Sequence, residues 1–158
     1  MLLHIPQVLT KQQVKDIRQI IDAADWADGV ITAGSQSAKA KNNTQLPEDG
    51  DDCKKARTIV LHALATNDLF LTGALPKRIY PPLFNRYTGQ KNAFGNHIDN
   101  SVRTHAATGR HVRTDVSCTL FLTEPEDYEG GELVIEDTYG SQRIKFAAGD
   151  MVLYPSSS

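Results

Sequence analysis

The tripeptide His97-Ile98-Asp99 has the residue types and the spacing that suit metal chemistry. On an extended segment, residues i and i+2 project to the same side, so the imidazole and the carboxylate can occupy neighbouring positions on one metal ion. They are two of the three ligands in the two-His-one-carboxylate triad, which binds iron(II) and leaves three coordination positions open. A surface loop with an unrelated histidine and aspartate gives the same letters, so the tripeptide alone leaves both interpretations open.

Further segments stand around this tripeptide in a fixed order. They are Asn85-Arg86-Tyr87-Thr88-Gly89 and Phe94 upstream, and Arg113-Thr114-Asp115, Tyr128-Glu129-Gly130-Gly131-Glu132 and Ala148-Gly149-Asp150-Met151-Val152-Leu153-Tyr154-Pro155 downstream. In this order the segments resemble the prolyl-4-hydroxylase-like oxygenases, and especially the bacterial PKHD-type hydroxylases. The resemblance covers nearly the whole chain, and its most specific part runs from Asn85 to Ser158.

The resemblance implies a mainly β fold, with a double-stranded β-helix (jelly-roll) core and flanking helices. It implies iron(II), the cosubstrates 2-oxoglutarate and O2, ascorbate as a further cofactor, and hydroxylation of an unactivated C–H bond. His97 and Asp99 match the family's first two iron ligands, and Tyr87 matches a strand tyrosine that hydrogen-bonds 2-oxoglutarate. Tyr80, or a Tyr87 that only packs, fits the same pattern. The group is associated with iron uptake, which implies an iron or siderophore context without naming a substrate.

The third iron ligand of the family is a histidine that comes just after the segment matched by Pro155–Ser158. An arginine about ten residues further on clamps the remote carboxylate of 2-oxoglutarate in that family through a bidentate ion pair. The resemblance therefore implies a domain truncated at its C-terminal end. Residues 1–158 alone are expected to bind metal weakly and to turn over inefficiently, whereas a longer chain is expected to be active.

Two histidines inside the chain offer another third ligand. His105 and His111 follow Asp99 in the polar segment Asn100–Arg113. The other interpretation of this segment is a solvated loop over the mouth of the barrel. Its arginines (Arg103, Arg110 and Arg113) could contact an acidic substrate or the cosubstrate there.

The elements that must position these residues follow from periodicity. Thr10 and Gln13 have the capping-box spacing, and a stripe of apolar residues at helical spacing follows them, which predicts a helix that fades near Asp25. A second helix is predicted over about Asp51–Thr66, and residues 28–50 are predicted to form a long loop with a short strand at Val30–Thr32. After Gly73 the pattern has period 2. The predicted strands are Arg78–Tyr80, Leu83–Tyr87, Thr114–Thr123, Glu132–Glu136, Gln142–Phe146 and Met151–Tyr154.

Short strands with turns about every ten residues are typical of an all-β barrel or sandwich. The two helices are expected to cover one sheet of it. We expect a single oxygenase domain over 1–158, incomplete at its C-terminal end, with a helical flank at 1–75 and the jelly-roll core at 76–158. The last strand, which reaches Tyr154, would then be an edge open to pairing with another chain.

Composition narrows the classes of partner that this chain is expected to bind. The chain has 158 residues, 40% of them hydrophobic, and a net charge of -2. Such a balance does not favour nucleic acid or a membrane surface, so the expected partner is a small-molecule or peptide substrate, and the oligomeric state stays open. The N-terminus lacks the pattern of a secretory signal, which favours a cytoplasmic protein. Cys118 is predicted to be a small core residue, and a disulfide with Cys53 is not expected.

Two rival functions fit parts of the pattern. A non-catalytic jelly-roll module could bind a small ligand or a sugar, and its binding would not depend on His97 and Asp99. A cupin-like metal enzyme without 2-oxoglutarate normally clusters several histidines on neighbouring strands. Here only His97 lies in a suitable motif, so this interpretation ranks last.

Overall fold

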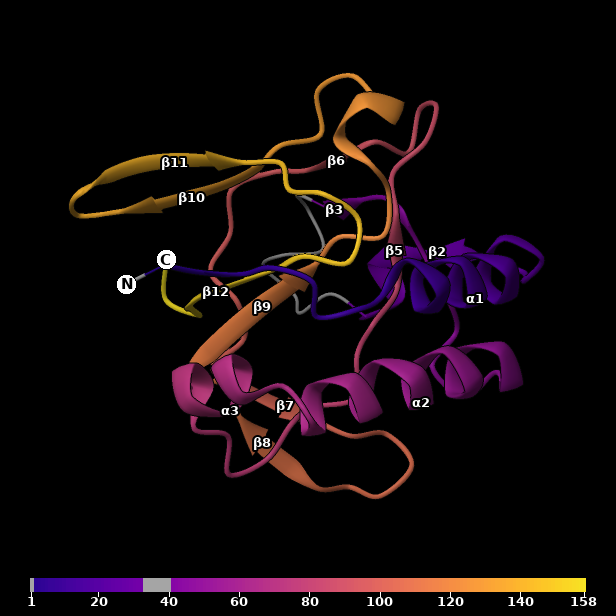
Figure 1. Cartoon of the computed structure of the whole chain (residues 1–158), viewed down its shortest axis with the longest axis horizontal. Helices are drawn as coiled ribbons and strands as arrows, with labels where there is room; N and C mark the ends of the chain where they lie inside the picture. The colour runs from indigo at the N-terminus through magenta and orange to yellow at the C-terminus, as the bar shows by residue number, and fades with distance from the viewer. Residues whose placement is uncertain (1, 33–40) are drawn as a thin grey trace.

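The computed structural model describes residues 2–32 and 41–158 (Figure 1). The α-helices in these residues are α1 (Lys11–Asp22), α2 (Asp51–Ala65) and α3 (Asp68–Ala74). The strands are β1 (Leu3–Ile5), β2 (Ala27–Asp28), β3 (Lys41–Asn42), β4 (Thr44–Gln45), β5 (Asn85–Arg86), β6 (Ala93–Phe94), β7 (Val102–Thr104), β8 (His111–Arg113), β9 (Val116–Leu120), β10 (Leu133–Asp137), β11 (Gly140–Ile144) and β12 (Met151–Pro155). None of the described helices is long and apolar enough to cross a bilayer.

The first helix begins as its sequence predicts. The Gln13 backbone N–H donates to Thr10 Oγ1 at 3.1 Å, and the Thr10 backbone N–H donates to Gln13 Oε1 at 2.9 Å. This reciprocal pair satisfies two backbone donors that the helix itself cannot. The stripe on α1 turns inward and buries Ile17 and Ile21. The capping box and the buried stripe are thus both confirmed.

The second helix, α2, also lies where it was predicted, but α3 was missed. Asn67 caps its start, where the Asn67 side-chain oxygen accepts from the Phe70 backbone N–H at 2.8 Å, and Leu75, which has φ 44°, caps its end. A helix of seven residues spans only about two turns, too few for a periodic pattern to stand out.

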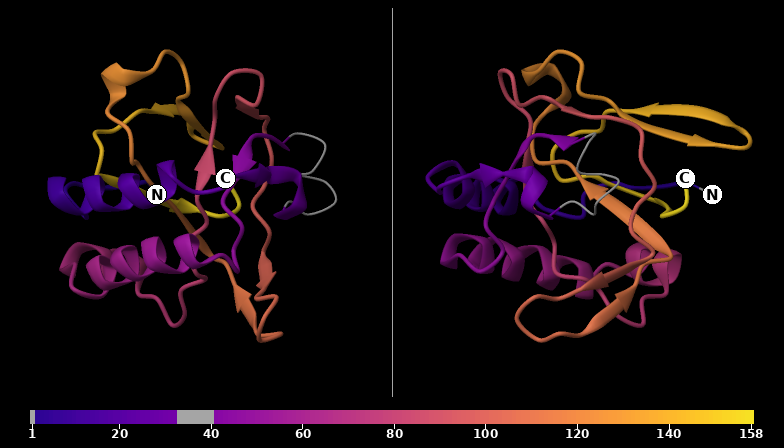
Figure 2. Two further views of the ribbon diagram at one scale, coloured as in Figure 1. Left: turned by 90° about the vertical axis from the view of Figure 1, so that its right-hand side faces the viewer. Right: turned by 180° about the vertical axis from the view of Figure 1, so that it is seen from behind.

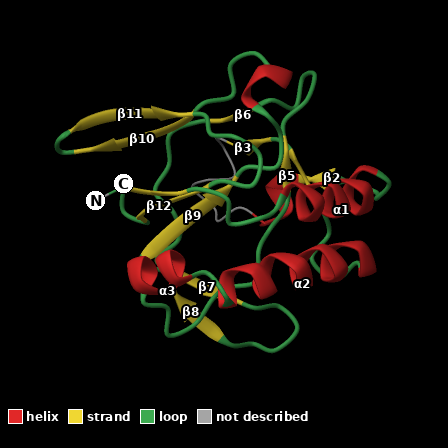
Figure 3. Cartoon of the chain, in the orientation of Figure 1, coloured by secondary structure: helices red, strands yellow, loops and turns green. Residues whose placement is uncertain are grey.

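The largest sheet has the order β1-β12-β9, with both pairings antiparallel. The two predicted helices pack on one face of it, as expected, and α3 joins them there, sharing a core with Ile5, Met151 and Leu153 (Figure 3). Strand β1 pairs with β12 and so brings the two ends of the chain close together (Figure 2). Because β1 takes one side of β12 and β9 the other, β12 is a central strand, and the prediction of an open edge at Tyr154 is wrong.

The other face of this sheet meets the hairpin β10–β11. Val152 is fully buried there against Ile135 and Ile144, and Phe121 and Phe146 pack beside them. The remaining described strands form three small sheets, ordered β2-β4-β5, β3-β6 and β7-β8. The fold is thus mainly β, with its helices on one side and its strands divided among small sheets.

Several strand predictions made from the local sequence are wrong. Arg78–Tyr80 is not a strand, and Leu83–Tyr87 contributes only Asn85–Arg86, because Pro81 and Pro82 lack the N–H groups that pairing needs. Val30–Thr32 belongs to a 3-10 helix over Gly29–Thr32, where the Val30 backbone N–H donates to Asp28 Oδ1 at 3.0 Å. Such a bond favours a turn over a strand.

Two segments predicted as loops contain strands. The segment 28–50 includes β3 and β4, while its residues 33–40 lie outside the described part. The polar segment Asn100–Arg113 forms the hairpin β7–β8. Cys118 is exposed and not a core residue, because the helices cover β12 more fully than β9; it and the buried Cys53 are both free thiols.

Candidate metal centre

His97 and Asp99 come together just after β6. His97 Nε2 lies 3.3 Å from Asp99 Oδ1, and both side chains remain partly accessible, at 24% and 34%. His97 Nδ1 donates to the Gly95 carbonyl at 2.8 Å, and the imidazole stacks on the Phe94 ring with centroids 3.6 Å apart. Because a carbonyl only accepts, Nδ1 carries the proton and Nε2 is left to face Asp99 or a metal ion.

The separation of these two atoms fits a shared metal ion. Divalent first-row metals bind imidazole nitrogen and carboxylate oxygen at about 2.1 Å, so ligands at right angles lie about 3.0 Å apart. The observed 3.3 Å needs little movement to reach that geometry. Among the described residues, however, no third histidine, cysteine, aspartate or glutamate joins the pair into a three-ligand group.

The two histidines considered as internal third ligands are engaged elsewhere. His105 Nδ1 lies 3.0 Å from Thr108 Oγ1, and His111 Nδ1 lies 2.9 Å from Thr104 Oγ1. Both contacts lie within the β7–β8 hairpin, which extends beneath α3, away from the β10–β11 hairpin (Figure 1). The structure therefore does not bring either histidine to His97 and Asp99.

Two serines that the sequence did not point to form hydrogen bonds with Asp99. Ser117 Oγ, on β9, donates to Asp99 Oδ2 at 2.5 Å and lies 2.8 Å from Ser156 Oγ. The Asp99 backbone N–H donates to the Ser156 carbonyl at 3.2 Å. One carboxylate oxygen is thereby fixed by the protein while the other faces His97. Only the alternation of β9 signalled this arrangement, since it places Ser117 and Thr119 on the same face.

These contacts also set the protonation of the pair. The hydrogen bond to Asp99 raises the pKa of His97, against the effect of burial, and the bond to Gly95 adds to the rise. Burial favours neutral Asp99, but the hydrogen bonds from His97 and Ser117 outweigh it and lower the Asp99 pKa. The carboxylate is therefore ionised at neutral pH, and a metal ion at Nε2 would compete with a proton.

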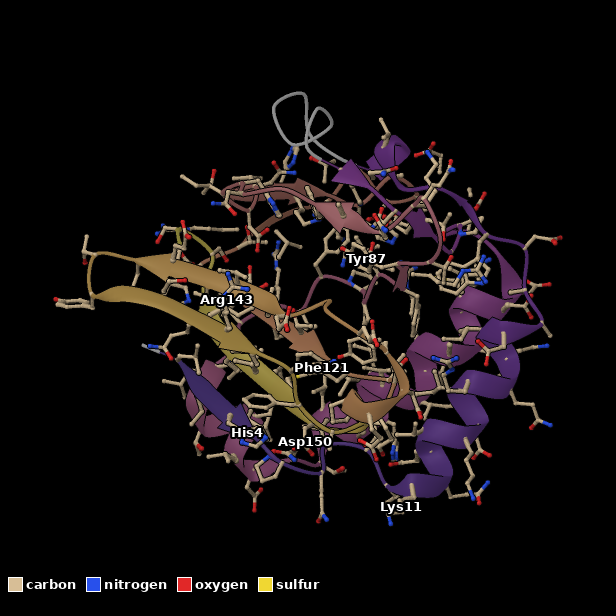
Figure 4. All side chains as sticks on the ribbon, turned by 90° about the horizontal axis from the view of Figure 1, so that it is seen from above. His4, Lys11, Tyr87, Phe121, Arg143 and Asp150 are labelled. Atoms are coloured by element: carbon tan, nitrogen blue, oxygen red, sulfur yellow. The ribbon has the colours of Figure 1, made fainter. Side chains whose placement is uncertain are left out.

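Two tyrosines, Tyr87 and Tyr154, are candidates to bind an anionic ligand. Tyr87 follows β5 (Figure 4), and its hydroxyl hydrogen-bonds the Asn43 side chain. Although 46% of Tyr87 is exposed, desolvation raises the pKa of its hydroxyl, and the bond with Asn43 offsets only part of the rise. Tyr154, on β12, lies 3.4 Å from Thr119 Oγ1, and burial raises its pKa to about 12. Both hydroxyls stay protonated and can donate to an anionic ligand.

Tyr80, the alternative to Tyr87, is occupied in another way. Its hydroxyl donates to Glu48 Oε1 at 3.4 Å, and the Arg103 guanidinium lies 4.8 Å from its ring centroid. A hydroxyl that donates to a carboxylate is not available as a donor to a second anion. The geometry thus favours Tyr87 over Tyr80.

A second group missed from the sequence is Lys41, Asn43 and Gln45, which alternate along β3 and β4. All three are buried, and Lys41 Nζ donates to Gln45 Oε1 at 2.9 Å. Lys41 is paired in register with Phe94, and its Nζ lies 5.4 Å from the centroid of that ring. The residues of this segment are so polar that their sequence predicts a loop. Its spacing of two is the one signal that these side chains share a face.

Gly29 makes room for this polar group. Its backbone N–H donates to the Asn43 carbonyl at 2.9 Å, and a Cβ at Gly29 would lie 1.8 Å from Asn43 Oδ1 and 3.0 Å from Lys41 Cε. We expect Gly29→Ala to displace both side chains and to lower the free energy of unfolding by about 1–3 kcal/mol, measured by urea denaturation. Gly50→Ala is the matched control, because a Cβ there meets only Pro47 O at 3.4 Å. An equal loss in both variants would contradict this account.

Ser117 should act on metal affinity through Asp99. Ser117→Ala removes the hydrogen bond to Oδ2, and changes of this kind behind a metal ligand typically weaken metal binding about 10- to 100-fold. Calorimetric titration with Mn(II) measures the effect. Thr119→Val is the control on the same face of β9, since Thr119 contacts Tyr154 and not Asp99. Unchanged affinity in Ser117→Ala would show that Ser117 does not orient the carboxylate.

Comparison with known proteins identifies a family for this chain. The sequence model of the 2OG-Fe(II) oxygenase superfamily matches residues 82–158, which include His97, Asp99 and Ser117. The chain is 57% identical over 158 residues to a PKHD-type hydroxylase of Variovorax paradoxus and 60% identical to one of Saccharophagus degradans. It is 54% identical to a third from Methylobacillus flagellatus. The matches cover 100% of this chain and 69%, 70% and 69% of those relatives.

Proposed function

Because this chain belongs to the PKHD-type hydroxylases of the 2-oxoglutarate- and iron(II)-dependent oxygenase superfamily, we propose that His97 and Asp99 bind its iron and that Tyr87 hydrogen-bonds its 2-oxoglutarate. The observation that carries the proposal is the 3.3 Å separation of His97 Nε2 and Asp99 Oδ1, with Ser117 holding the second carboxylate oxygen. Two ligands on one side of an ion leave its other positions to a further ligand, a bidentate 2-oxo acid and dioxygen.

The chain's own residues have separate tasks in this proposal. Iron(II), 2-oxoglutarate and O2 together supply the oxidising chemistry that hydroxylates a C–H bond and yields succinate and CO2. Asp99 stays ionised and is oriented by Ser117. His97 keeps its proton on Nδ1, which donates to the Gly95 carbonyl, so that Nε2 is free to bind. The Tyr87 hydroxyl remains a donor because its pKa is raised. Ascorbate is proposed as a reductant that keeps the iron divalent.

We propose further that the strands form the jelly-roll of this superfamily within a single oxygenase domain. The burial of β12 supports this. Alternate residues of β12 enter separate cores, with Met151 and Leu153 facing the helices and Val152 facing the β10–β11 hairpin. The packing of a second pair of strands on one face of β12, with helices on the other face, fits two sheets packed together and flanked by helices.

The net charge of -2 and the family support a proposal about the binding partners of this chain. The substrate would be a small molecule or a peptide, with no nucleic acid or membrane involved, and the protein would work in the cytoplasm. An iron-uptake context is the most specific role that the family resemblance favours. The chemistry of the site gives no other name to the substrate.

Anaerobic titration with Fe(II) and 2-oxoglutarate tests the proposed site. Chelation of iron(II) by the 2-oxo acid gives a weak visible charge-transfer band, and we expect the band to saturate with added metal. Succinate is the matched control, because it lacks the 2-oxo group and should give no band. Calorimetry in parallel reports whether metal is bound. Bound metal without a band would reject the cosubstrate role, and ligand binding that is independent of metal would indicate a non-catalytic module.

A further inference from the structure

Basic and acidic residues are unevenly distributed along this chain. Residues 69–114 hold seven of its 17 lysines and arginines, but only one of its 19 aspartates and glutamates, which is Asp99. The rest of the chain therefore carries a clear excess of negative charge. A basic stretch within an acidic chain creates a local positive potential that attracts anionic partners.

Part of this positive charge is engaged within the protein itself. Two of the seven cations form ion pairs with aspartates, and two lie over aromatic rings: Lys91 with Asp28, Arg113 with Asp115, Arg86 over Trp26, and Arg103 over Tyr80. The other three are Lys77, Arg78 and Arg110, which are all exposed. None of these three has a carboxylate within ion-pair distance in the described part of the chain.

The three exposed cations belong to one region, where the segment after α3 meets the β7–β8 hairpin (Figure 1). Arg78 donates through one guanidinium nitrogen to the His111 carbonyl at 3.2 Å. Lys77 precedes Arg78, and Arg110 precedes His111. The Arg110 carbonyl in turn accepts from the His105 backbone N–H at 2.9 Å, which ties it to the opposite strand of the hairpin. We call Lys77, Arg78 and Arg110 the basic surface.

Apolar side chains flank this basic surface. Leu75 is 80% exposed and Ile79 is 40% exposed, and they stand on either side of Lys77 and Arg78 in the chain. Large apolar side chains that remain in water beside cations indicate a surface for a partner that offers both negative charge and apolar groups.

The same region is poorly suited to nucleic acid. Single strands stack their bases on accessible aromatic rings, but the Tyr80 ring is covered by the Arg103 guanidinium and meets the His105 ring edge-on, with centroids 6.2 Å apart. Three unpaired cations also offer few contacts to a phosphate backbone. The negative charge of the rest of the chain would repel a long polyanion or an extended anionic membrane.

We propose that the basic surface docks an acidic segment of another polypeptide, whose carboxylates contact Arg78 and Arg110 and whose apolar side chains contact Leu75 and Ile79. The hydrogen bond to the His111 carbonyl already orients Arg78, so less side-chain freedom is lost when its remaining N–H groups bind a carboxylate. This inference goes beyond the proposed function, because docking here requires neither iron nor 2-oxoglutarate.

Fluorescence anisotropy of a labelled peptide rich in glutamate and leucine tests the proposal on the whole chain without metal. The variants are Lys77→Gln and Arg110→Gln, whose side chains form no hydrogen bond or ion pair within the described residues, so the fold should persist. Each should weaken binding about two- to fivefold, and the double variant about tenfold. The controls are Lys11→Gln and Arg143→Gln, which remove exposed cations on α1 and β11 (Figure 4). Binding to the parent chain should also weaken as salt is added.

A loss confined to Lys77→Gln and Arg110→Gln supports the docking surface. The same peptide with glutamine in place of each glutamate should bind weakly, and equal binding of the two peptides would overturn the proposal. So would the absence of binding to the parent chain, or an equal loss in the control variants. If oligothymidylate or phosphatidylserine vesicles bound more tightly than the acidic peptide, and with the same dependence on the two cations, the partner would be nucleic acid or membrane and the proposal would be wrong.

Discussion

Asp99→Ala is expected to lower metal affinity by at least about 100-fold and to abolish the charge-transfer band of the 2-oxoglutarate chelate. The variant loses one of the two proposed protein ligands, and that loss should exceed the 10- to 100-fold typical of groups that only support a ligand. It also removes the acceptor of the Ser117 hydroxyl and the partner of His97 Nε2. Anaerobic titration with Fe(II) and 2-oxoglutarate, followed by visible absorption, measures the effect.

The control for Asp99→Ala is Asp115→Ala. Asp115 is an exposed carboxylate just before β9 and pairs with Arg113 at 2.7 Å, so its loss should leave metal binding unchanged. If Asp99→Ala bound Fe(II) as tightly as the parent chain, Asp99 would not be a ligand, and the His97–Asp99 contact would be an ordinary ion pair.

Gly149→Ala is expected to be the most destabilising of the glycine replacements, by about 2–4 kcal/mol in the free energy of unfolding. Gly149 has φ +96°, which an L-residue rarely adopts, and a Cβ there would lie 2.7 Å from the Leu9 carbonyl oxygen. The Gly149 carbonyl accepts from the Leu9 N–H at 3.1 Å, and its own N–H donates to Phe121 O at 2.8 Å. The new methyl group would push apart the turn that joins β1, β9 and β12.

Gly130→Ala separates backbone strain from this clash. Gly130 has φ +61°, and nothing lies within 4 Å of the position of its Cβ, so only the conformational cost of about 1 kcal/mol should appear. Urea denaturation of both variants gives the comparison. Equal destabilisation would mean that the close approach to Leu9 contributes nothing.

Asp150, which follows Gly149, ties the same turn to the N-terminal segment. Asp150 Oδ1 accepts from the Gln7 N–H at 2.9 Å, and Oδ2 lies 2.8 Å from His4 Nε2, whose ring stacks on Phe146 (Figure 4). Asp150 thus contacts two residues of the N-terminal segment. Its bonds in fact fasten the N-terminal segment to the last described strand.

The sequence by itself determined the features that depend on neighbours along the chain. The Thr10–Gln13 capping box, the buried stripe of α1 and the alternation of β9 all follow from contacts within a few residues. The approach of His97 to Asp99 belongs here too, because residues two apart on an extended segment share a side. The family resemblance rested on such local motifs, and the comparisons confirm the family.

The tertiary structure alone decided what surrounds that pair. Ser117 and Ser156 reach Asp99 because β9 and β12 lie side by side, and Lys41 reaches Phe94 because β3 pairs with β6. The two residues of each of these contacts lie between 18 and 57 positions apart in the chain. No local pattern specifies such pairings. Strand pairing is decided by which faces are buried together, a property of the assembled sheets, and so the side chains that surround His97 and Asp99 could be seen only in the folded protein.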